Sequence, residues 1–174
     1  MSKLLIVIDY QNDFVDGALG FEDAVKIENN ILKIIKDFKD NGDQIVYTLD
    51  THNNDYMDTI EGKNLPVPHC IKGSKGHQLY GKVYDELNGC LFFEKETFGS
   101  KTLAKYLEEN KFEQITLIGV VTNICVLSNA IVAKTIQPNA NIVVDAACCA
   151  SNDLLLEQKA YDILENLHIK VINR

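Results

Sequence analysis

Six short runs of apolar residues, rich in β-branched side chains, recur along the chain and predict six β-strands. Most of these runs are continuous rather than alternating in polarity, which is typical of strands that are covered on both faces. The pattern therefore predicts a buried sheet. The predicted strands span residues 4–9, 44–50, 90–95, 114–121, 141–146 and 169–173.

The stretches between these runs carry helical periodicity. In residues 24–42 the apolar side chains fall largely on one stripe, and the pattern stops at Asn41-Gly42, a helix C-cap signal. Similar patterns span 100–111, 123–136 and 152–168. Because strands and helices alternate, the sequence predicts an α/β fold with three layers, α/β/α, in which helices cover both faces of a mainly parallel six-stranded sheet.

Residues 52–88 interrupt this alternation. The segment contains several glycines and two prolines and reads mostly as a loop. Loops of that length are uncommon in a compact domain and usually serve a function. We therefore expect part of a binding site there.

Length and composition predict one ordinary domain over residues 1–174. Hydrophobic residues make up 46% of the 174 positions and charged residues 24%, which is usual for a globular protein. No apolar run approaches the roughly 20 residues that cross a bilayer. We expect a soluble protein without a membrane partner.

The charge balance and the cysteines indicate which partners and which cellular location to expect. With 25 acidic and 17 basic residues the formal net charge is −8, which opposes binding to nucleic acid. The N-terminal apolar run is too short for a signal peptide, and it meets the acidic Asp9 at once. The five cysteines form no CxxC pair, so we expect thiols and a cytoplasmic location.

Reactive side chains gather where predicted strands end. Asp9, Asp50 and Lys95 end the first three strands, and Cys125 follows the fourth. Ligands of parallel sheets bind beyond these carboxyl ends. A helix start or a nearby cation such as Lys95 lowers a thiol pKa from about 8.5 to roughly 3.5–7.5, and Asp9 could take the proton. Singly, each residue has an ordinary explanation, as core filling, a helix cap or a surface ion pair; their joint placement favours a nucleophilic site.

A second group surrounds Asp50. His52 lies two positions on, and Glu61 and His69 follow in the long loop. Carboxylates combined with imidazoles suit a divalent metal such as zinc, iron or manganese.

The remaining histidines and cysteines have no comparable group of reactive residues near them in the predicted fold. We expect His77 and His168 at the surface and Cys148-Cys149 in the core or a loop. Cys70, adjacent to His69, is expected to point away from the metal group, because adjacent side chains on an extended chain face opposite sides.

Taken together, these residues resemble the isochorismatase-like cysteine hydrolase superfamily, and within it most closely the nicotinamidases. The resemblance covers nearly the whole chain. It is carried by LLIVIDYQNDF at 4–14, Asp50-Thr51-His52, PHCIKGSKGHQL at 68–79, Phe93-Glu94-Lys95 and GVVTNICV at 119–126.

The resemblance implies roles for individual residues. Asp9, Lys95 and Cys125 match the family's catalytic triad. A cis peptide between Val120 and Val121 would aim the Val121 and Cys125 N–H groups at one point, forming an oxyanion hole. The metal ligands fall on Asp50, His52 and His69, with Glu61 as an additional acidic ligand in some members.

The resemblance also implies a substrate, nicotinamide, hydrolysed to nicotinate and ammonia in NAD salvage, and a homo-oligomeric assembly. Phe14 and Phe98 match the aromatic walls of the pyridine pocket. Two positions depart from the common pattern: residues 64–68 lack an aromatic side chain, and Asn123 replaces the usual Asp. The alternatives are another small amide of the N-carbamoyl or ureido type, an isochorismatase-type hydrolase, and a non-catalytic thiol sensor.

Overall fold

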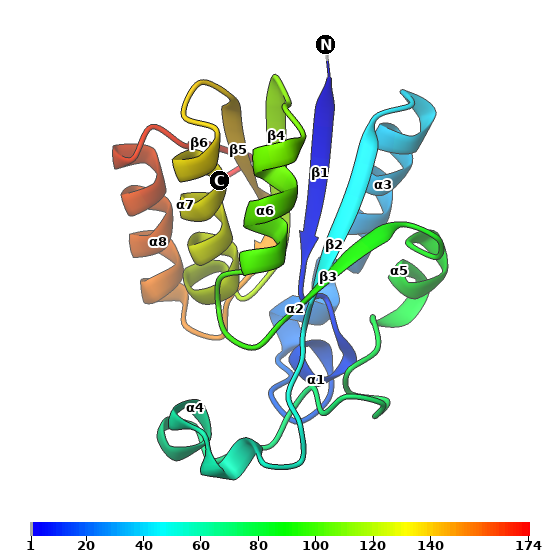
Figure 1. Cartoon of the computed structure of the whole chain (residues 1–174), viewed down its shortest axis with the longest axis vertical. Helices are drawn as coiled ribbons and strands as arrows, with labels where there is room; N and C mark the ends of the chain where they lie inside the picture. Colours follow the sequence, from blue (N-terminus) through cyan, green and yellow to red (C-terminus); the bar gives the residue numbers. More distant parts are fainter. Residues whose placement is uncertain (1) are drawn as a thin grey trace.

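The computed structural model describes residues 2–174 and contains one six-stranded sheet (Figure 1). All neighbouring strands are parallel, in the order β3-β2-β1-β4-β5-β6. The predicted sheet is therefore confirmed and is parallel throughout. The strands are β1 (Lys3–Ile8), β2 (Gln44–Asp50), β3 (Leu91–Lys95), β4 (Gln114–Val120), β5 (Asn141–Ala150) and β6 (Lys170–Ile172).

Helices cover both faces of the sheet, which confirms the three-layer prediction. On one face, side chains such as Leu5 and Val7 of β1 pack against α1 (Asn12–Val15), α2 (Glu22–Lys26), α3 (Glu28–Asp40) and α5 (Gly81–Glu86). On the other, Leu4 and Ile6 pack against α6 (Lys101–Glu109), α7 (Leu127–Ile136) and α8 (Leu154–Asn166). The alternation along β1 shows why its sequence is apolar at every position: each face has its own core.

Most elements lie within two residues of their predicted bounds, and three depart further. The helix predicted over 24–42 is divided at Ile27 into α2 and α3. The fourth predicted strand is followed by a π-helical turn, Thr122–Val126, before α7 begins. The strand β5 runs four residues further than predicted, because a register shift opposite Leu117 and Gly119 of β4 lets its small residues continue the pairing.

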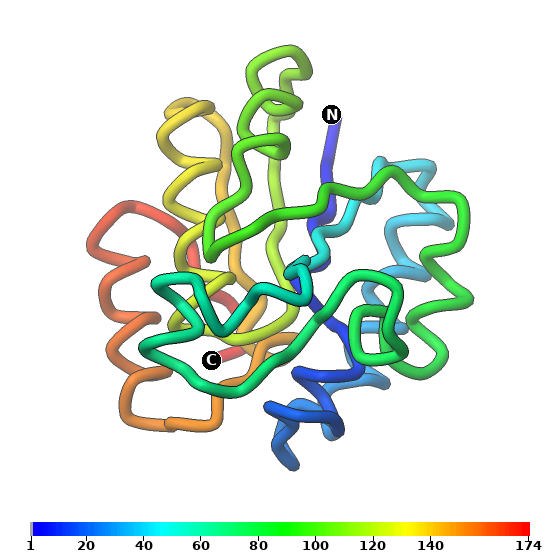
Figure 2. The backbone as a smooth tube through the Cα atoms, turned by 60° about the horizontal axis from the view of Figure 1, so that its bottom comes forward, coloured from blue at the N-terminus to red at the C-terminus, as the bar shows by residue number. Residues whose placement is uncertain are grey.

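The segment 52–88 crosses the carboxyl ends of the strands (Figure 2). It contains a 3₁₀ turn (Tyr56–Asp58), the short helix α4 (Ile60–Asn64) and α5. An isolated parallel β-bridge pairs His52 with Ile71 and so joins two distant parts of this segment. Among the described residues, no helix combines the length and apolar character needed to cross a bilayer.

Gly119 allows β4 to approach the end of β1. Its φ is +117°, a conformation that side chains with a Cβ rarely adopt, and a Cβ placed there would collide with the backbone oxygen of Ile8. Ile8 immediately precedes Asp9, so this close approach sets the spacing of two strands at the edge where the reactive residues gather.

We expect Gly119→Ala to lower the free energy of unfolding by about 2 to 4 kcal/mol, because the new methyl group meets the rigid Ile8 backbone and the positive φ disfavours a residue with a Cβ. Urea unfolding followed by circular dichroism measures the change. Gly99→Ala is the matched control, since a Cβ there meets only Val132, at an ordinary 3.6 Å. Equal stability of the two variants would contradict this account of Gly119.

Candidate active site

The strand register brings a lysine and two carboxylates together at the carboxyl edge. Asp50 is the direct neighbour of Lys95 in the β2–β3 pairing. The Lys95 side chain also reaches Asp9, which follows β1 on the far side of β2. Its Nζ lies 2.7 Å from Asp9 Oδ2 and 3.2 Å from Asp50 Oδ1. All three side chains are buried, so their charges interact with little screening by water.

Cys125 completes this group from the π-helical turn after β4. Lys95 Nζ lies 3.5 Å from its Sγ. The peptide bond between Val120 and Val121 is cis, and the N–H groups of Ile124 and Val126 both donate to the Val121 carbonyl. The π-helical turn that these hydrogen bonds close carries the Cys125 sulfur beside the ammonium group.

Asp9 presents its two oxygens to different partners. Its Oδ1 accepts a hydrogen bond of 2.6 Å from the Thr48 hydroxyl, which in turn accepts one from the Asp9 N–H. Its Oδ2 meets Lys95 and, among the described residues, receives no well-directed hydrogen bond. The residue has a φ of +45°, a strained backbone conformation of the kind that clusters at functional sites. Oδ2 is therefore the oxygen that is available to take a proton.

Burial dominates the ionisation of the nucleophile. It raises the pKa of the Cys125 thiol well above its ordinary value, and the Lys95 charge opposes this without overcoming it. The expected lowering of the thiol pKa is therefore not found. Burial likewise raises the pKa of Asp9, against the opposing charge of Lys95. For Lys95 itself, burial lowers the pKa, but the charges of Asp9 and Asp50, and that of the Cys125 sulfur whenever it is ionised, outweigh burial, so the pKa is raised. The sulfur rests as a thiol and needs a base beside it.

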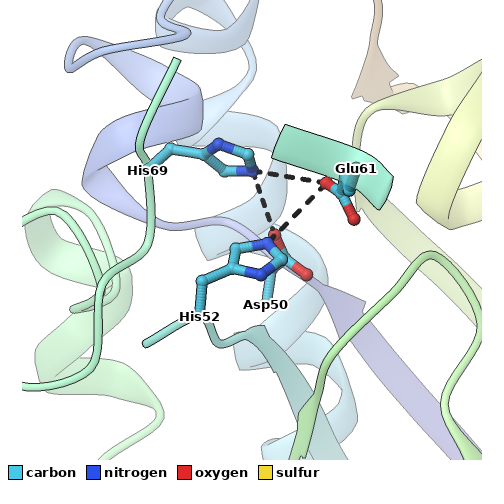
Figure 3. Close-up of side chains that lie close together, drawn as sticks. All are labelled: Asp50, His52, Glu61 and His69. Carbon is cyan, nitrogen blue, oxygen red and sulfur yellow. Dashed lines mark hydrogen bonds and ion pairs between the residues drawn. The ribbon is translucent and has the colours of Figure 1, made fainter. Parts of the chain in front are cut away.

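Four side chains of the second group point at one another (Figure 3). One ligand atom from each lies within 4.8 Å of the others: these come from Asp50, His52, Glu61 and His69. Asp50 Oδ2 lies 2.9 Å from His52 Nε2 and 3.3 Å from His69 Nε2, and Glu61 Oε1 lies 3.7 Å from both nitrogens. Four ligands bonded at about 2.0 to 2.1 Å in a tetrahedron are about 3.3 Å apart, so the spacing fits a small divalent ion.

Two further observations fit a metal. His69 Nδ1 lies 2.8 Å from the Val67 carbonyl, so Nδ1 carries a proton and Nε2 is the ring nitrogen that faces the group, where an ion would displace any proton on it. With Asp9, Asp50 and Glu61 counted as ionised and both imidazoles as neutral ligands, three negative charges face the single positive charge of Lys95, and burial together with the Asp50 charge raises the pKa of Glu61. A divalent cation would balance this excess.

Asp50 belongs to both groups. Its Oδ1 faces Lys95 and its Oδ2 faces the two histidines. Burial raises its pKa, but the hydrogen bonds with His52 and His69 and the Lys95 charge outweigh this, so the carboxyl pKa is lowered and the group stays ionised. One carboxylate thus joins the candidate metal centre to the candidate nucleophile.

A cavity of about 650 Å³ opens beside both groups. Phe98 is 46% exposed and lines it, as do Ile124, next to Cys125, and Leu65. Phe14, in contrast, is only 7% exposed and packs its ring edge-to-face against His69, with ring centroids 5.4 Å apart. Of the two aromatic walls expected, the structure places Phe98 at this cavity and Phe14 behind a histidine.

Two side chains at the site were not singled out from the sequence. Tyr56 lines the cavity, and its ring lies edge-on to His52 and His69, with centroids 4.7 and 5.0 Å away. Thr48 orients Asp9, as described above. The only signal for Thr48 was a polar side chain within an apolar strand; Tyr56 lay in a loop whose path the sequence does not fix.

The expectation that His77 lies at the surface is wrong. The residue is buried, and its Nε2 lies 2.8 Å from the Thr51 hydroxyl, because the long loop folds back over the strand ends. His168 is exposed, as expected. Cys148 and Cys149 are buried in β5, which confirms a structural placement, and Cys70 is buried in the core outside the metal group.

The chain is similar to several known proteins in both sequence and structure. The chain is 37% identical over 143 residues to the uncharacterized isochorismatase family protein PncA of Bacillus subtilis, covering 75% of this chain and 78% of that protein. The crystal structure of a pyrazinamidase/nicotinamidase from Streptococcus mutans superposes with a TM-score of 0.88 at 34% identity, covering 98% and 100% of the two chains. A pyrazinamidase of Pyrococcus horikoshii in complex with zinc superposes with a TM-score of 0.85 at 25% identity over the full length of both.

The family assignment does not depend on any single relative. Residues 3–174 match the Isochorismatase domain, which spans nearly the whole chain and includes every residue of the two groups described above. The chain belongs to the isochorismatase family.

Proposed function

We propose that the protein is a metal-containing cysteine amidohydrolase that hydrolyses nicotinamide to nicotinate and ammonia. The observation that carries the proposal is the contact of one buried ammonium group, that of Lys95, with both the Asp9 carboxylate and the Cys125 sulfur. This arrangement supplies a buried nucleophile and its base next to a cavity that Ile124, the neighbour of Cys125, lines. The substrate is proposed from the solved relatives, which are named nicotinamidase and pyrazinamidase.

In the first half of the proposed reaction, Asp9 Oδ2 takes the proton of the Cys125 thiol. The thiolate attacks the carboxamide carbon and forms a C–S bond, while the N–H groups of Val121 and Cys125 hold the developing oxyanion. The Asp9 carboxyl then gives its proton to the amide nitrogen. The C–N bond breaks, ammonia leaves, and a thioester remains on the sulfur.

In the second half, Asp9 takes a proton from a water molecule, whose oxygen attacks the thioester carbon. The C–S bond breaks, the sulfur recovers its proton from Asp9, and the nicotinic acid that forms loses its own proton to solvent to give nicotinate. Lys95 stays charged throughout, because its raised pKa keeps its proton in place. Its positive charge stabilises whichever of Asp9 and Cys125 is negative at each step.

We propose that Asp50, His52 and His69 hold a divalent ion, with Glu61 as a further ligand, and that the ion is zinc rather than iron or manganese. The two imidazoles and the zinc complex of the Pyrococcus relative support this identity. When bound, the ion supplies a Lewis-acidic position for the pyridine nitrogen. Phe98 would face the ring, and Phe14 would support it indirectly through His69.

We further propose that residues 1–174 form a single domain and that the protein works in the cytoplasm, in salvage of NAD. All six strands share one sheet, and the five cysteines are free thiols, which suits a reducing compartment. Fractionation of the source cells, with the protein followed by antibody, tests the location; recovery outside the cytoplasm would contradict it.

We also propose that the chain forms homo-oligomers. Three consecutive exposed leucines at the start of α8, Leu154 to Leu156, support an interface between copies. Light scattering coupled to gel filtration gives the molar mass directly. We expect a multiple of the 19.5 kDa chain, and a monomeric mass at micromolar concentration would contradict the proposal.

Cys125→Ala is expected to lower the rate of ammonia release from nicotinamide by at least about a thousandfold, because no thioester can form. A coupled ammonia assay on purified protein measures this. Cys90→Ala is the control, since this thiol lies outside the site and should retain wild-type activity. If wild type is no faster than Cys125→Ala on nicotinamide but hydrolyses an N-carbamoyl amide, the substrate is wrong and the nucleophile stands.

His69→Ala is expected to weaken zinc binding by about a hundredfold, because it removes one imidazole from the ligand set. Isothermal titration of the chelator-treated protein with zinc gives the dissociation constant without reference to activity. His77→Ala is a matched control: a second buried histidine of the same loop, outside the ligand group. Equal losses in the two variants would refute the metal centre as described.

A further inference from the structure

Asn129 connects the nucleophile turn to the wall of the cavity. It lies on α7, four residues after Cys125, and is fully buried. Its side-chain Nδ2 donates to the Cys125 carbonyl at 2.8 Å and to the Phe98 carbonyl at 2.9 Å, and its Oδ1 accepts from the Ser100 N–H at 2.9 Å. One amide thus binds two segments that come from different strands.

The orientation of this amide is fixed by its partners. Two of them are carbonyl oxygens, which only accept, and the third is a backbone N–H, which only donates. Exchanging the amide oxygen and nitrogen would break all three hydrogen bonds inside the core. No other amino acid of similar size offers two donors and an acceptor in this arrangement.

The segment 96–99, which carries Phe98, is anchored at its far end by Ser100, the buried N-cap of α6, and otherwise makes few hydrogen bonds. It begins directly after Lys95, whose Nζ donates to the Thr97 carbonyl at 3.0 Å. At Gly99 there is no side chain, and even a Cβ there would meet only Val132 within 4 Å. The Phe98 side chain itself is half exposed in the cavity. Between Lys95 and the α6 N-cap at Ser100, the backbone that carries the ring is held by the hydrogen bonds to the Lys95 ammonium and the Asn129 amide.

We propose that Asn129 is a positioning residue that sets the distance between the Phe98 ring and the Cys125 sulfur and thereby selects flat ring amides. The inference rests on the proposed function. Ile124, the neighbour of Cys125, lines the same cavity as Phe98. Because the Asn129 amide holds both backbones, it fixes the width of the space into which a planar substrate fits.

Asn129→Ser separates the two attachments of this residue. In the same helix, the Ser128 and Thr135 hydroxyls donate to the carbonyls four residues earlier, at 2.7 and 2.8 Å. A serine at position 129 can bond the Cys125 carbonyl in this way, but it is too short to reach the segment of Phe98. The variant therefore keeps the support of the nucleophile turn and releases only the cavity wall.

We expect Asn129→Ser to raise the KM for nicotinamide about tenfold and to change kcat by less than about threefold, since the ring is held less well while Asp9, Lys95 and Cys125 stay in place. Nicotinamide affinity, measured by calorimetry in a Cys125→Ala background, should weaken by a similar factor. This second measurement does not depend on turnover.

Gln137→Ser is the matched control. Gln137, just beyond the other end of α7, is also buried, and its amide makes the same pattern of bonds, donating to the carbonyls of Leu107 and Asn110 and accepting from the Phe112 N–H. Thermal unfolding should show a loss of stability in both variants. Only Asn129→Ser should alter KM.

A double-mutant cycle with Phe98→Ala decides whether Asn129 acts through this ring. If it does, Asn129→Ser adds no further rise in KM once Phe98 is gone. Additive effects, or a loss of kcat with unchanged KM, would overturn the inference while leaving the proposed function intact.

Should Asn129→Ser fail to fold, Asn129→Ala at reduced temperature takes its place with the same expected KM effect. Wild-type protein that neither binds nor hydrolyses nicotinamide would overturn the proposed function itself.

Discussion

The buried ammonium group of Lys95 is the interaction on which the rest of the candidate site depends. It lies within 3.5 Å of Asp9, Asp50 and Cys125, and water has almost no access to any of them. Removing charges from water costs several kcal/mol per ion, and only close opposite charges offset that cost. Without Lys95 the Asp9 carboxylate would keep only the Thr48 hydroxyl, and Asp50 would keep only the two histidines. The cation therefore explains how three strand ends can converge at one point.

Asp50 extends this arrangement to the second group. Because one oxygen faces Lys95 and the other faces His52 and His69, the charge of this carboxylate is shared between a candidate nucleophilic centre and a candidate metal centre. A change in either group alters the electrostatic surroundings of the other. The backbone of Asp50 is fixed as well: Gln11, fully buried, accepts from its N–H and donates to its carbonyl. Contacts with other side chains thus fix both the backbone and the carboxylate of Asp50.

Much of the fold follows from patterns that are local in sequence. Continuous apolar runs predicted the parallel sheet, since only strands covered on both faces require apolar residues at successive positions. The 3.6-residue stripe of α3 places Ile31, Ile35 and Phe38 in the core. The break at Ile27 was not predicted, because nothing in its immediate sequence interrupts the stripe. The π-helical turn was missed for a related reason: its bonds to Val121 depend on how β4 ends.

The sequence by itself determined which chemical groups stand at the strand ends, because parallel strands deliver their carboxyl ends to one edge and the residue types there are read directly. The tertiary structure alone decided how those groups meet. Thr48 and Asp9 are 39 positions apart, and Asn129 and Phe98 are 31 apart, so no local pattern indicates either bond. It also decided the state of Cys125: a neighbouring cation suggested a lowered thiol pKa, but burial outweighs that charge and raises the pKa. Burial is a property of the packed chain, which a sequence motif does not contain.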